Sequence, residues 1–284
     1  MRFAHLGAGA PRLAVVHEGD AVYVDELIDD APRDLQELIE RGPDALAELR
    51  RAASGAVGSH RVHELRHHSA VLRPPSVVAI GANYAAHSSE LALKVEKAAT
   101  IFSLWPNSLT GHDQTTTWPQ DLTGQVDYEA ELGVIIGREA KDVPERDALD
   151  YVFGYTVVND ITARDLQFSE AQWSRCKSFD GFTPTGPVVV TADEVPDPQD
   201  LWLTTNLDGR IMQDASTADM VRSVARIVSY LSRSATLLPG TLISTGSPGG
   251  AGYSRTPPVF LHDGSTVTVS IGGIGYLTTH CRVV

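Results

Sequence analysis

The sequence is poor in cysteine and has fewer basic than acidic residues. Its two cysteines, Cys176 and Cys281, stand far apart, so they form neither a disulfide framework nor the closely spaced pairs of a zinc site. The 36 acidic residues outnumber the 23 basic ones and give a net charge of -13. Because this charge repels a phosphate backbone, nucleic acid is not an expected partner.

Long apolar runs are also missing. No run approaches the roughly 18 apolar residues of a membrane span. The first 20 residues lack the apolar core of a signal peptide. We therefore expect a cytoplasmic protein without a membrane partner.

The N-terminal part of the chain has the patterns of a small α+β unit. Residues 12–24 alternate polar and apolar side chains around a Gly-Asp turn, which predicts a hairpin. Residues 34–51 have helical spacing interrupted by a Gly-Pro pair, which predicts two helices. Two prolines follow Arg73 and favour extended backbone. We therefore expect a small N-terminal α+β domain at 1–73 and a larger domain at 74–284.

The larger domain is dominated by short apolar, β-branched runs between Gly, Pro and Asp residues. One amphipathic helix is expected from Asp219 to about Ala235. The predicted fold class is α+β and mostly β. Strands are expected at residues 77–80, 132–136, 155–158, 188–190, 242–244 and 266–271.

An acidic strand is the clearest sign of a functional site. The two-residue period of a strand puts Asp127, Glu129 and Glu131 on one face, and the strand then becomes apolar on both faces, which indicates burial. Buried carboxylates are costly unless they are compensated, and a divalent cation compensates them. Asp160 ends a second apolar strand and is the predicted third ligand beside Glu129 and Glu131. Oxygen ligands favour Mg²⁺ or Mn²⁺; the alternative is a solvent-facing edge strand whose charges discourage aggregation.

A lysine and a histidine–glutamate pair are further candidates. Lys177 would balance the excess negative charge of three carboxylates and one dication, although most single lysines are solvated. His87 and Glu90 are three residues apart, so a helical turn would place them on one face. The histidine would then act as a base on water and the carboxylate would orient it. The same spacing is also common on exposed helices.

Several segments together resemble the fumarylacetoacetate hydrolase family, from about Pro74 to Val284. The motifs occur in the family's order, so their combination is more specific than any one of them. They are N-Y-x-x-H-x-x-E from Asn83, D-Y-E-x-E-L from Asp127, G-Y-T-x-x-N-D-x-x-A-R-D-x-Q from Gly154, K-S-F-D from Lys177, and T-G-S-P from Thr245.

The resemblance implies a catalytic domain with the family's mixed β-sandwich or roll, usually dimeric, after a small N-terminal domain. It implies that Glu129, Glu131 and Asp160 ligate Mg²⁺ or Mn²⁺ and that Lys177 stabilises developing negative charge. It also implies a water-activating pair, formed by His87 and Glu90, on a lid that orders on binding. The implied substrate contacts are Arg164, Gln167, Thr245, Gly246 and Ser247.

The implied chemistry is cleavage next to a carbonyl of a small oxo-acid, through a metal-stabilised enolate. In the hydrolases, a water activated by His87 would break a carbon-carbon bond of an acylpyruvate or related 1,3-dicarbonyl acid. Decarboxylases of oxaloacetate-like acids and isomerases that shift an enol or double bond use the same type of site. These reactions stay open as alternatives, as does a non-catalytic binding protein. We expect a homodimer.

Two positions depart from the family's pattern. Leu104 stands where many members have lysine, so a cation is missing from the predicted pocket rim. We therefore expect a substrate with a larger or more apolar tail that packs on Leu104 and Trp105. Ser247 stands where threonine is commoner and keeps the hydroxyl.

Overall fold

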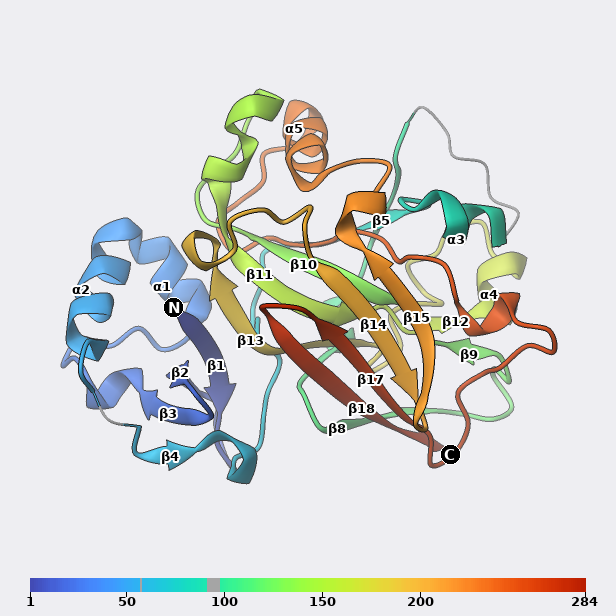
Figure 1. Cartoon of the computed structure of the whole chain (residues 1–284), viewed down its shortest axis with the longest axis horizontal. Helices are drawn as coiled ribbons and strands as arrows, with labels where there is room; N and C mark the ends of the chain where they lie inside the picture. Colours follow the sequence, from blue (N-terminus) through green and yellow to red (C-terminus); the bar gives the residue numbers. More distant parts are fainter. Residues whose placement is uncertain (57, 91–97) are drawn as a thin grey trace.

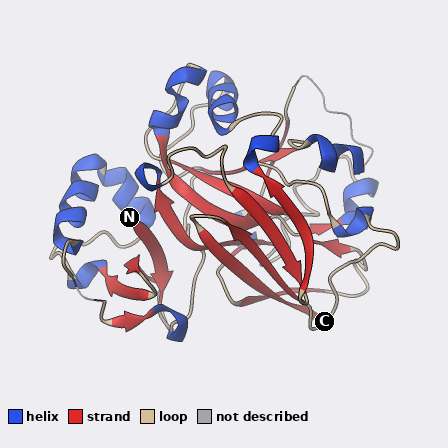
Figure 2. Ribbon diagram, viewed as in Figure 1, coloured by secondary structure: helices blue, strands red, loops and turns tan. Residues whose placement is uncertain are grey.

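A computed structural model of the chain describes residues 1–56, 58–90 and 98–284. Strands form 35% of the protein and helices 24%, which confirms the α+β, mostly β class. Figure 2 shows the strands in the interior and the helices at the periphery. Five α-helices are described: α1 (Leu35–Arg41), α2 (Pro43–Ala53), α3 (Ala85–Glu90), α4 (Arg164–Ser169) and α5 (Val224–Ser234).

The strands described form three sheets, with the order β4-β3-β2-β1-β13-β11-β10-β16-β5-β6 in the largest, where β7 also pairs with β13. This sheet contains β1 (Arg2–Leu6), β2 (Arg12–His17), β3 (Asp20–Tyr23), β4 (His60–Arg61), β5 (Val77–Gly81), β6 (Thr100–Ser103), β7 (Leu109–Thr110), β10 (Ala130–Ile136), β11 (Val152–Asn159), β13 (Thr183–Thr191) and β16 (Leu242–Ser244). A second sheet, β15-β14-β17-β18-β8, contains β8 (Gln114–Trp118), β14 (Trp202–Leu207), β15 (Arg210–Ser216), β17 (Thr266–Ile271) and β18 (Gly275–Val283). The third is the pair β9 (Val126–Asp127) and β12 (Thr162–Ala163).

The two larger sheets pack face to face, as Figure 1 shows for β10, β11 and β13 against β14, β17 and β18. Val134 and Val157 of the large sheet share one buried cluster with Leu203, Val269 and Leu277 of the smaller sheet. The six strands expected from apolar runs are all present. In β17 buried and half-buried residues alternate, so every second side chain enters the layer between the sheets. Strand β10 is buried along its whole length, because its two faces pack into different core clusters.

The N-terminal segment extends the large sheet. The predicted hairpin is β2–β3 and the two predicted helices are α1 and α2, so these expectations are confirmed. Asp34 caps α1 by accepting a hydrogen bond from the Glu37 backbone. Strand β1 pairs antiparallel with β13, so main-chain hydrogen bonds join this segment to the rest of the molecule. The domain boundary near residue 73 stays a prediction.

Helix α5 begins later than expected. Ser223 caps it by accepting from the Arg226 backbone, and residues 217–219 form a separate 3₁₀ turn. Its buried face is Val224, Ile227, Val228 and Leu231, as the spacing predicted. Within the described ranges, the helices are too short or too polar to cross a membrane.

Candidate active site

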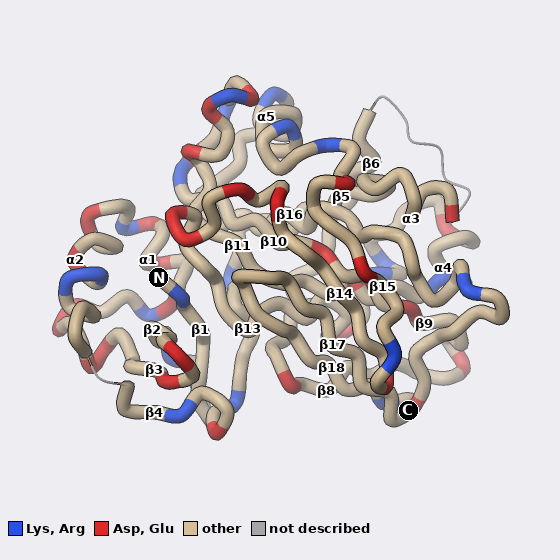
Figure 3. The backbone as a smooth tube through the Cα atoms, viewed as in Figure 1, with Lys and Arg blue, Asp and Glu red and all other residues tan. Residues whose placement is uncertain are grey.

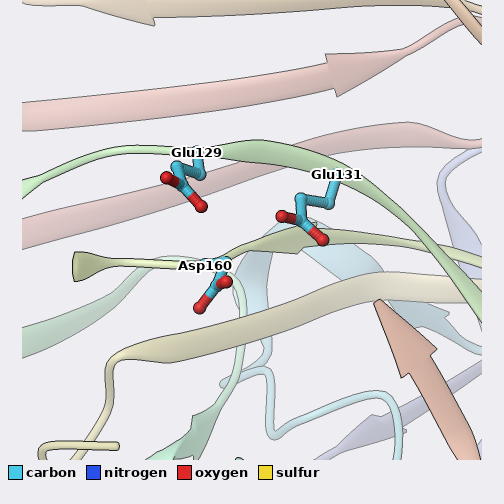
Figure 4. Close-up of side chains that lie close together, drawn as sticks. All are labelled: Glu129, Glu131 and Asp160. Carbon is cyan, nitrogen blue, oxygen red and sulfur yellow. The ribbon is translucent and has the colours of Figure 1, made fainter. Parts of the chain in front are cut away.

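Three acidic side chains meet where β10 begins and β11 ends. The two strands are antiparallel, with Ala130 opposite Asn159 and Glu131 opposite Val158. Glu129 therefore lies beside the residue after β11, and the Asp160 backbone N donates to the Glu129 carbonyl at 2.9 Å. One carboxylate oxygen from each of Glu129, Glu131 and Asp160 lies within 4.8 Å of the others, and Figure 4 shows the three groups facing a common point.

These carboxylates are buried, although most charged residues are not. Glu129, Glu131 and Asp160 are 4%, 2% and 0% exposed. In Figure 3 charged residues lie mainly on the outer helices and loops, and the central strands carry few. Charges buried in this way need partners within the protein or from a ligand.

Two cations compensate part of the charge. Lys177 Nζ donates to Glu129 Oε2 at 2.7 Å, to Asp160 Oδ2 at 2.6 Å and to Thr162 Oγ1 at 2.8 Å. Arg164 Nη1 lies 2.7 Å from Glu129 Oε1. Burial alone raises the pKa of Glu129, but Lys177 and Arg164 hold that pKa well below its usual range. Glu129 is therefore ionised.

The other two carboxylates are less well compensated. Burial, followed by the charges of Asp160 and Glu129, raises the pKa of Glu131 well above its usual range. Burial also raises the pKa of Asp160 to about 6, although Lys177 opposes the shift. Glu131 Oε2 accepts from Ser244 Oγ at 2.6 Å and from the Gly246 backbone at 2.8 Å. Three ionised carboxylates would carry more negative charge than Lys177 and Arg164 balance, so without a further cation Glu131 favours its protonated form.

Several buried polar atoms at this point have no hydrogen-bond partner among the described residues. They are Asp160 Oδ1, His87 Nδ1 and Arg164 Nη2. Orphaned buried atoms are uncommon because each costs free energy. An unpaired carboxylate oxygen within an all-oxygen group fits a divalent cation such as Mg²⁺ or Mn²⁺.

The predicted histidine–glutamate pair lies on α3. His87 Nε2 is 3.3 Å from Glu129 Oε1, and His87 Nδ1 is 3.9 Å from Glu90 Oε2. Burial alone lowers the pKa of His87, but Glu129 and Glu90 raise that pKa above its usual value. The Glu90 carboxylate accepts from the Gly250 backbone at 2.9 Å. Residues 91–97 of the predicted lid lie outside the described residues, so its ordering on binding stays a prediction.

Arg164 is fully buried and is held by two side chains besides Glu129. Its Nε donates to Asp127 Oδ2 at 2.8 Å and its Nη1 donates to Gln167 Oε1 at 2.9 Å. Gln167 also lines the cavity next to the carboxylates. Contact of Arg164 and Gln167 with substrate stays a prediction.

Asp127 does not belong to the group of three carboxylates. It contacts Arg164, the same side chain that contacts Glu129. The Asp127 carboxylate accepts from Arg164 and from the backbone of Gly252 at 2.8 Å and Tyr253 at 3.1 Å. It therefore positions Arg164, a role that period counting did not indicate.

The Thr245–Ser247 loop follows β16 and closes one side of the site. Thr245 Oγ1 donates to the Leu132 carbonyl at 2.8 Å. Gly246 has φ +98°, and a Cβ there would lie 2.7 Å from Asn83 Cβ, so glycine is required for this turn. Ser247 lines the cavity. Thr245 and Gly246 thus shape the loop, and Ser247 faces the space that a substrate would enter.

The Leu104 side chain does not line the cavity beside the carboxylates. It is 3% exposed in a core cluster with Val77 and Phe102, and the described cavity lining includes Phe102 but not Leu104. Trp105 is 43% exposed. Packing of a substrate tail on Leu104 and Trp105 stays a prediction, and in the present arrangement the Leu104 side chain is occupied by core contacts.

The cavity beside the carboxylates is small and has one polar and one apolar wall. Its volume of about 10 Å³ holds roughly one water molecule. One wall carries the charged groups, and the other is formed by Ile80, Phe102 and Trp173. The Trp173 and Phe102 rings meet edge to face at 5.4 Å. Sequence reasoning missed this apolar wall; the one available signal was Trp173, a large apolar residue in a polar segment close to Lys177.

Comparison with known proteins identifies the family. Residues 76–283 match the family described as fumarylacetoacetate (FAA) hydrolase, C-terminal. The chain belongs to the fumarylacetoacetate hydrolase family. An uncharacterized protein of Staphylococcus aureus (strain USA300) is 41% identical to it over 210 residues, which are 74% of this chain and 70% of the relative.

Two solved structures extend the likeness to the whole chain. Fumarylacetoacetate hydrolase from psychrophilic Exiguobacterium antarcticum has a TM-score of 0.87 and 36% identity, covering 100% of both chains. The 5-carboxymethyl-2-hydroxymuconate delta-isomerase from Mycobacterium smegmatis has a TM-score of 0.78 and 30% identity, covering 100% of this chain and 99% of that one. The predicted resemblance to the fumarylacetoacetate hydrolase family is confirmed. Members of the family are enzymes that include a hydrolase and an isomerase.

Proposed function

We propose that the chain is a metal-dependent hydrolase that breaks a carbon-carbon bond in an acylpyruvate-like 1,3-dicarbonyl acid. The observation that carries the proposal is the meeting of three buried carboxylates, within 4.8 Å of one another, with His87 at the same cavity. Membership of the fumarylacetoacetate hydrolase family supports an enzyme. The combination of a cation site and an adjacent base supports hydrolysis in particular.

Glu129, Glu131 and Asp160 would hold Mg²⁺ or Mn²⁺. The unpaired Asp160 Oδ1 and the incomplete compensation of the site support this assignment. When bound, the cation supplies Lewis-acid chemistry, polarising the substrate's carbonyl oxygens and stabilising negative charge there.

His87 would act as the base. Its Nδ1 faces the Glu90 carboxylate at 3.9 Å, its Nε2 lies 3.3 Å from Glu129 Oε1, and the ring lines the cavity, so the neutral ring can accept a proton from a water there. The carboxylates of Glu129 and Glu90 stabilise the imidazolium that forms, as the raised pKa of His87 indicates. Lys177 stays protonated, because Asp160 and Glu129 raise its pKa despite its burial. Its ammonium group can therefore stabilise negative charge that develops on the substrate beside these carboxylates.

A second candidate is isomerisation of an enol or double bond in a related acid. It is favoured by the similarity to the Mycobacterium smegmatis isomerase, which covers the whole chain. The same groups would move a proton without adding water.

Turnover of acylpyruvates in heavy-oxygen water, with Mg²⁺ or Mn²⁺ present, separates these reactions. Hydrolysis places the label in a carboxylate product. Isomerisation changes the ultraviolet spectrum without uptake of label into a new carboxylate, and decarboxylation releases carbon dioxide without forming a new carboxylate. Absence of turnover on every oxo-acid tested would contradict the enzymatic proposal.

A further inference from the structure

Gln213 lies behind the cavity on the second sheet. It belongs to β15 and pairs with Thr205 of β14 in a hairpin. Its side chain is 1% exposed and reaches from this sheet to the first residue of β10, Ala130, which stands between Glu129 and Glu131. It also reaches the loop that contains Ser247. One buried amide thus connects two segments that bound the cavity.

Four hydrogen bonds fix the orientation of the Gln213 amide. Its Oε1 accepts from the Ala130 backbone at 2.9 Å and from Thr205 Oγ1 at 2.7 Å. Its Nε2 donates to Ser247 Oγ at 2.8 Å and to the Pro248 carbonyl at 2.9 Å. A flipped amide would face the Ala130 N–H with an NH₂ group and the Pro248 carbonyl with an oxygen. Because both contacts would then be lost, one orientation is enforced.

This orientation decides what the Ser247 hydroxyl can do. Since Ser247 Oγ accepts a hydrogen bond from Gln213, its own proton must point elsewhere. Within the described part of the chain, the acceptor for that proton is the Pro248 carbonyl at 3.5 Å, which is long for a hydroxyl donor. Ser247 lines the cavity, so the proton is available to an acceptor there.

We propose that Gln213 is a positioning residue that makes Ser247 a hydrogen-bond donor toward an anionic oxygen of the substrate. The inference rests on the proposed function, because it assumes an oxo-acid bound at the carboxylates. Ser247 and the three carboxylates line the same cavity, so an oxo-acid bound at the carboxylates lies close to Ser247. Gln213 touches no substrate and acts only through the hydroxyl.

A double-mutant cycle tests this role. Gln213→Glu keeps the acceptor for Ala130 and Thr205 but replaces the donor to Ser247, so the hydroxyl turns toward the new carboxylate. Gln213→Met, which removes the donor without adding a charge, is the second variant. Each is combined with Ser247→Ala, and oxalate binding to the Mg²⁺-loaded protein is measured by calorimetry. A thermal melt of each variant checks folding.

The expected loss of oxalate affinity is that of one hydrogen bond to a charged group. Gln213→Met weakens oxalate binding up to about tenfold when serine is present and only slightly when alanine is present. Gln213→Glu gives a larger loss with serine, and part of that loss persists with alanine because the added carboxylate repels the oxalate dianion. The conservative Ser247→Thr variant keeps affinity close to that of the parent chain.

Two results would overturn the inference. In one, the Gln213 variants weaken oxalate binding equally in the serine and alanine backgrounds; in the other, Ser247→Ala leaves the affinity unchanged. If the parent chain itself binds no oxalate with Mg²⁺, the proposed function fails, which is a different outcome from failure of the Gln213 role alone.

Discussion

The N-terminal segment and the cavity both bury a histidine, but the two rings have different surroundings. His5 is 1% exposed, and both ring nitrogens meet the backbone: Nδ1 lies 3.1 Å from the Ser69 carbonyl and Nε2 accepts from Leu35 N at 3.1 Å. His87 is 5% exposed and its Nδ1 has no hydrogen-bond partner among the described residues. A fully paired buried group is part of the fold, whereas an unpaired one is completed by a ligand or costs free energy.

The two histidines also differ in their tendency to take up a proton. Burial lowers the pKa of His5 to about 4, although its hydrogen bond to Ser69 opposes the shift. His5 is therefore neutral in the fold. The neighbouring carboxylates raise the pKa of His87 against the effect of burial. Comparison of the two histidines thus separates a structural group from one that suits proton transfer.

The largest effect is expected from the carboxylates. Asp160→Asn keeps the size of the side chain but removes a charge that a divalent cation needs. Turnover and Mg²⁺ affinity should each fall by more than about a hundredfold, because even residues behind metal ligands often cost 10- to 100-fold. Enzyme assays and metal titration measure this. Glu139→Gln, at an exposed acidic position, is the matched control, and an equal loss in both variants would contradict a specific role.

Replacing His87 should separate chemistry from metal binding. His87→Gln removes the proposed base, so kcat should fall by about 100-fold or more. Because histidine is not one of the three oxygen donors, Mn²⁺ affinity should change little. If Mn²⁺ affinity falls as far as kcat does, His87 would be acting as a ligand or as a structural residue.

Acid should destabilise the N-terminal segment through His5. Its folded pKa of about 4 lies below the unfolded value of about 6.5. The unfolded chain therefore takes up the proton first, and stability falls as pH drops from about 6.5 toward 4. The expected loss is roughly 2 kcal/mol by pH 5.

Urea unfolding at pH 7 and pH 5 measures this loss. His5→Asn should reduce the difference in unfolding free energy between pH 7 and pH 5 by about that amount. His17→Asn, at an exposed histidine, is the control and should leave it unchanged. Equal pH dependence in the parent and His5→Asn chains would show that folding does not lower the pKa of His5.

The smallest effect is expected at Leu104. Leu104→Lys places a cation among the core side chains around Leu104, and activity on acylpyruvates should shift toward diacids by roughly tenfold or less. Measurement of kcat/KM on a panel with apolar and acidic tails tests this. If activity does not shift toward diacids, Leu104 does not determine the substrate specificity.

Local patterns explain why much of the site could be predicted. Apolar runs identified the strands that meet at the site, and antiparallel pairing of β10 with β11 brings Glu129 and Glu131 beside Asp160. The contact of Asp127 with Arg164 could not be predicted in this way, because it joins residues 37 positions apart in the chain.

Other features depend on contacts between distant segments. Gln213 reaches Ser247 from a different sheet, and Trp173 joins Phe102 across the cavity wall. The burial of Leu104 likewise results from how β6 packs beside α1 residues and β5. Such long-range packing leaves no period or spacing in the sequence.

Direct titration of the metal-free chain with Mn²⁺ tests the central claim that these carboxylates form a cation site. Calorimetry with electron paramagnetic resonance should give one tightly bound ion per chain, and Glu131→Gln and Asp160→Asn should abolish that binding while the variants stay folded. Binding of equal strength in the parent and both variants, or no binding by the parent chain, would contradict the claim.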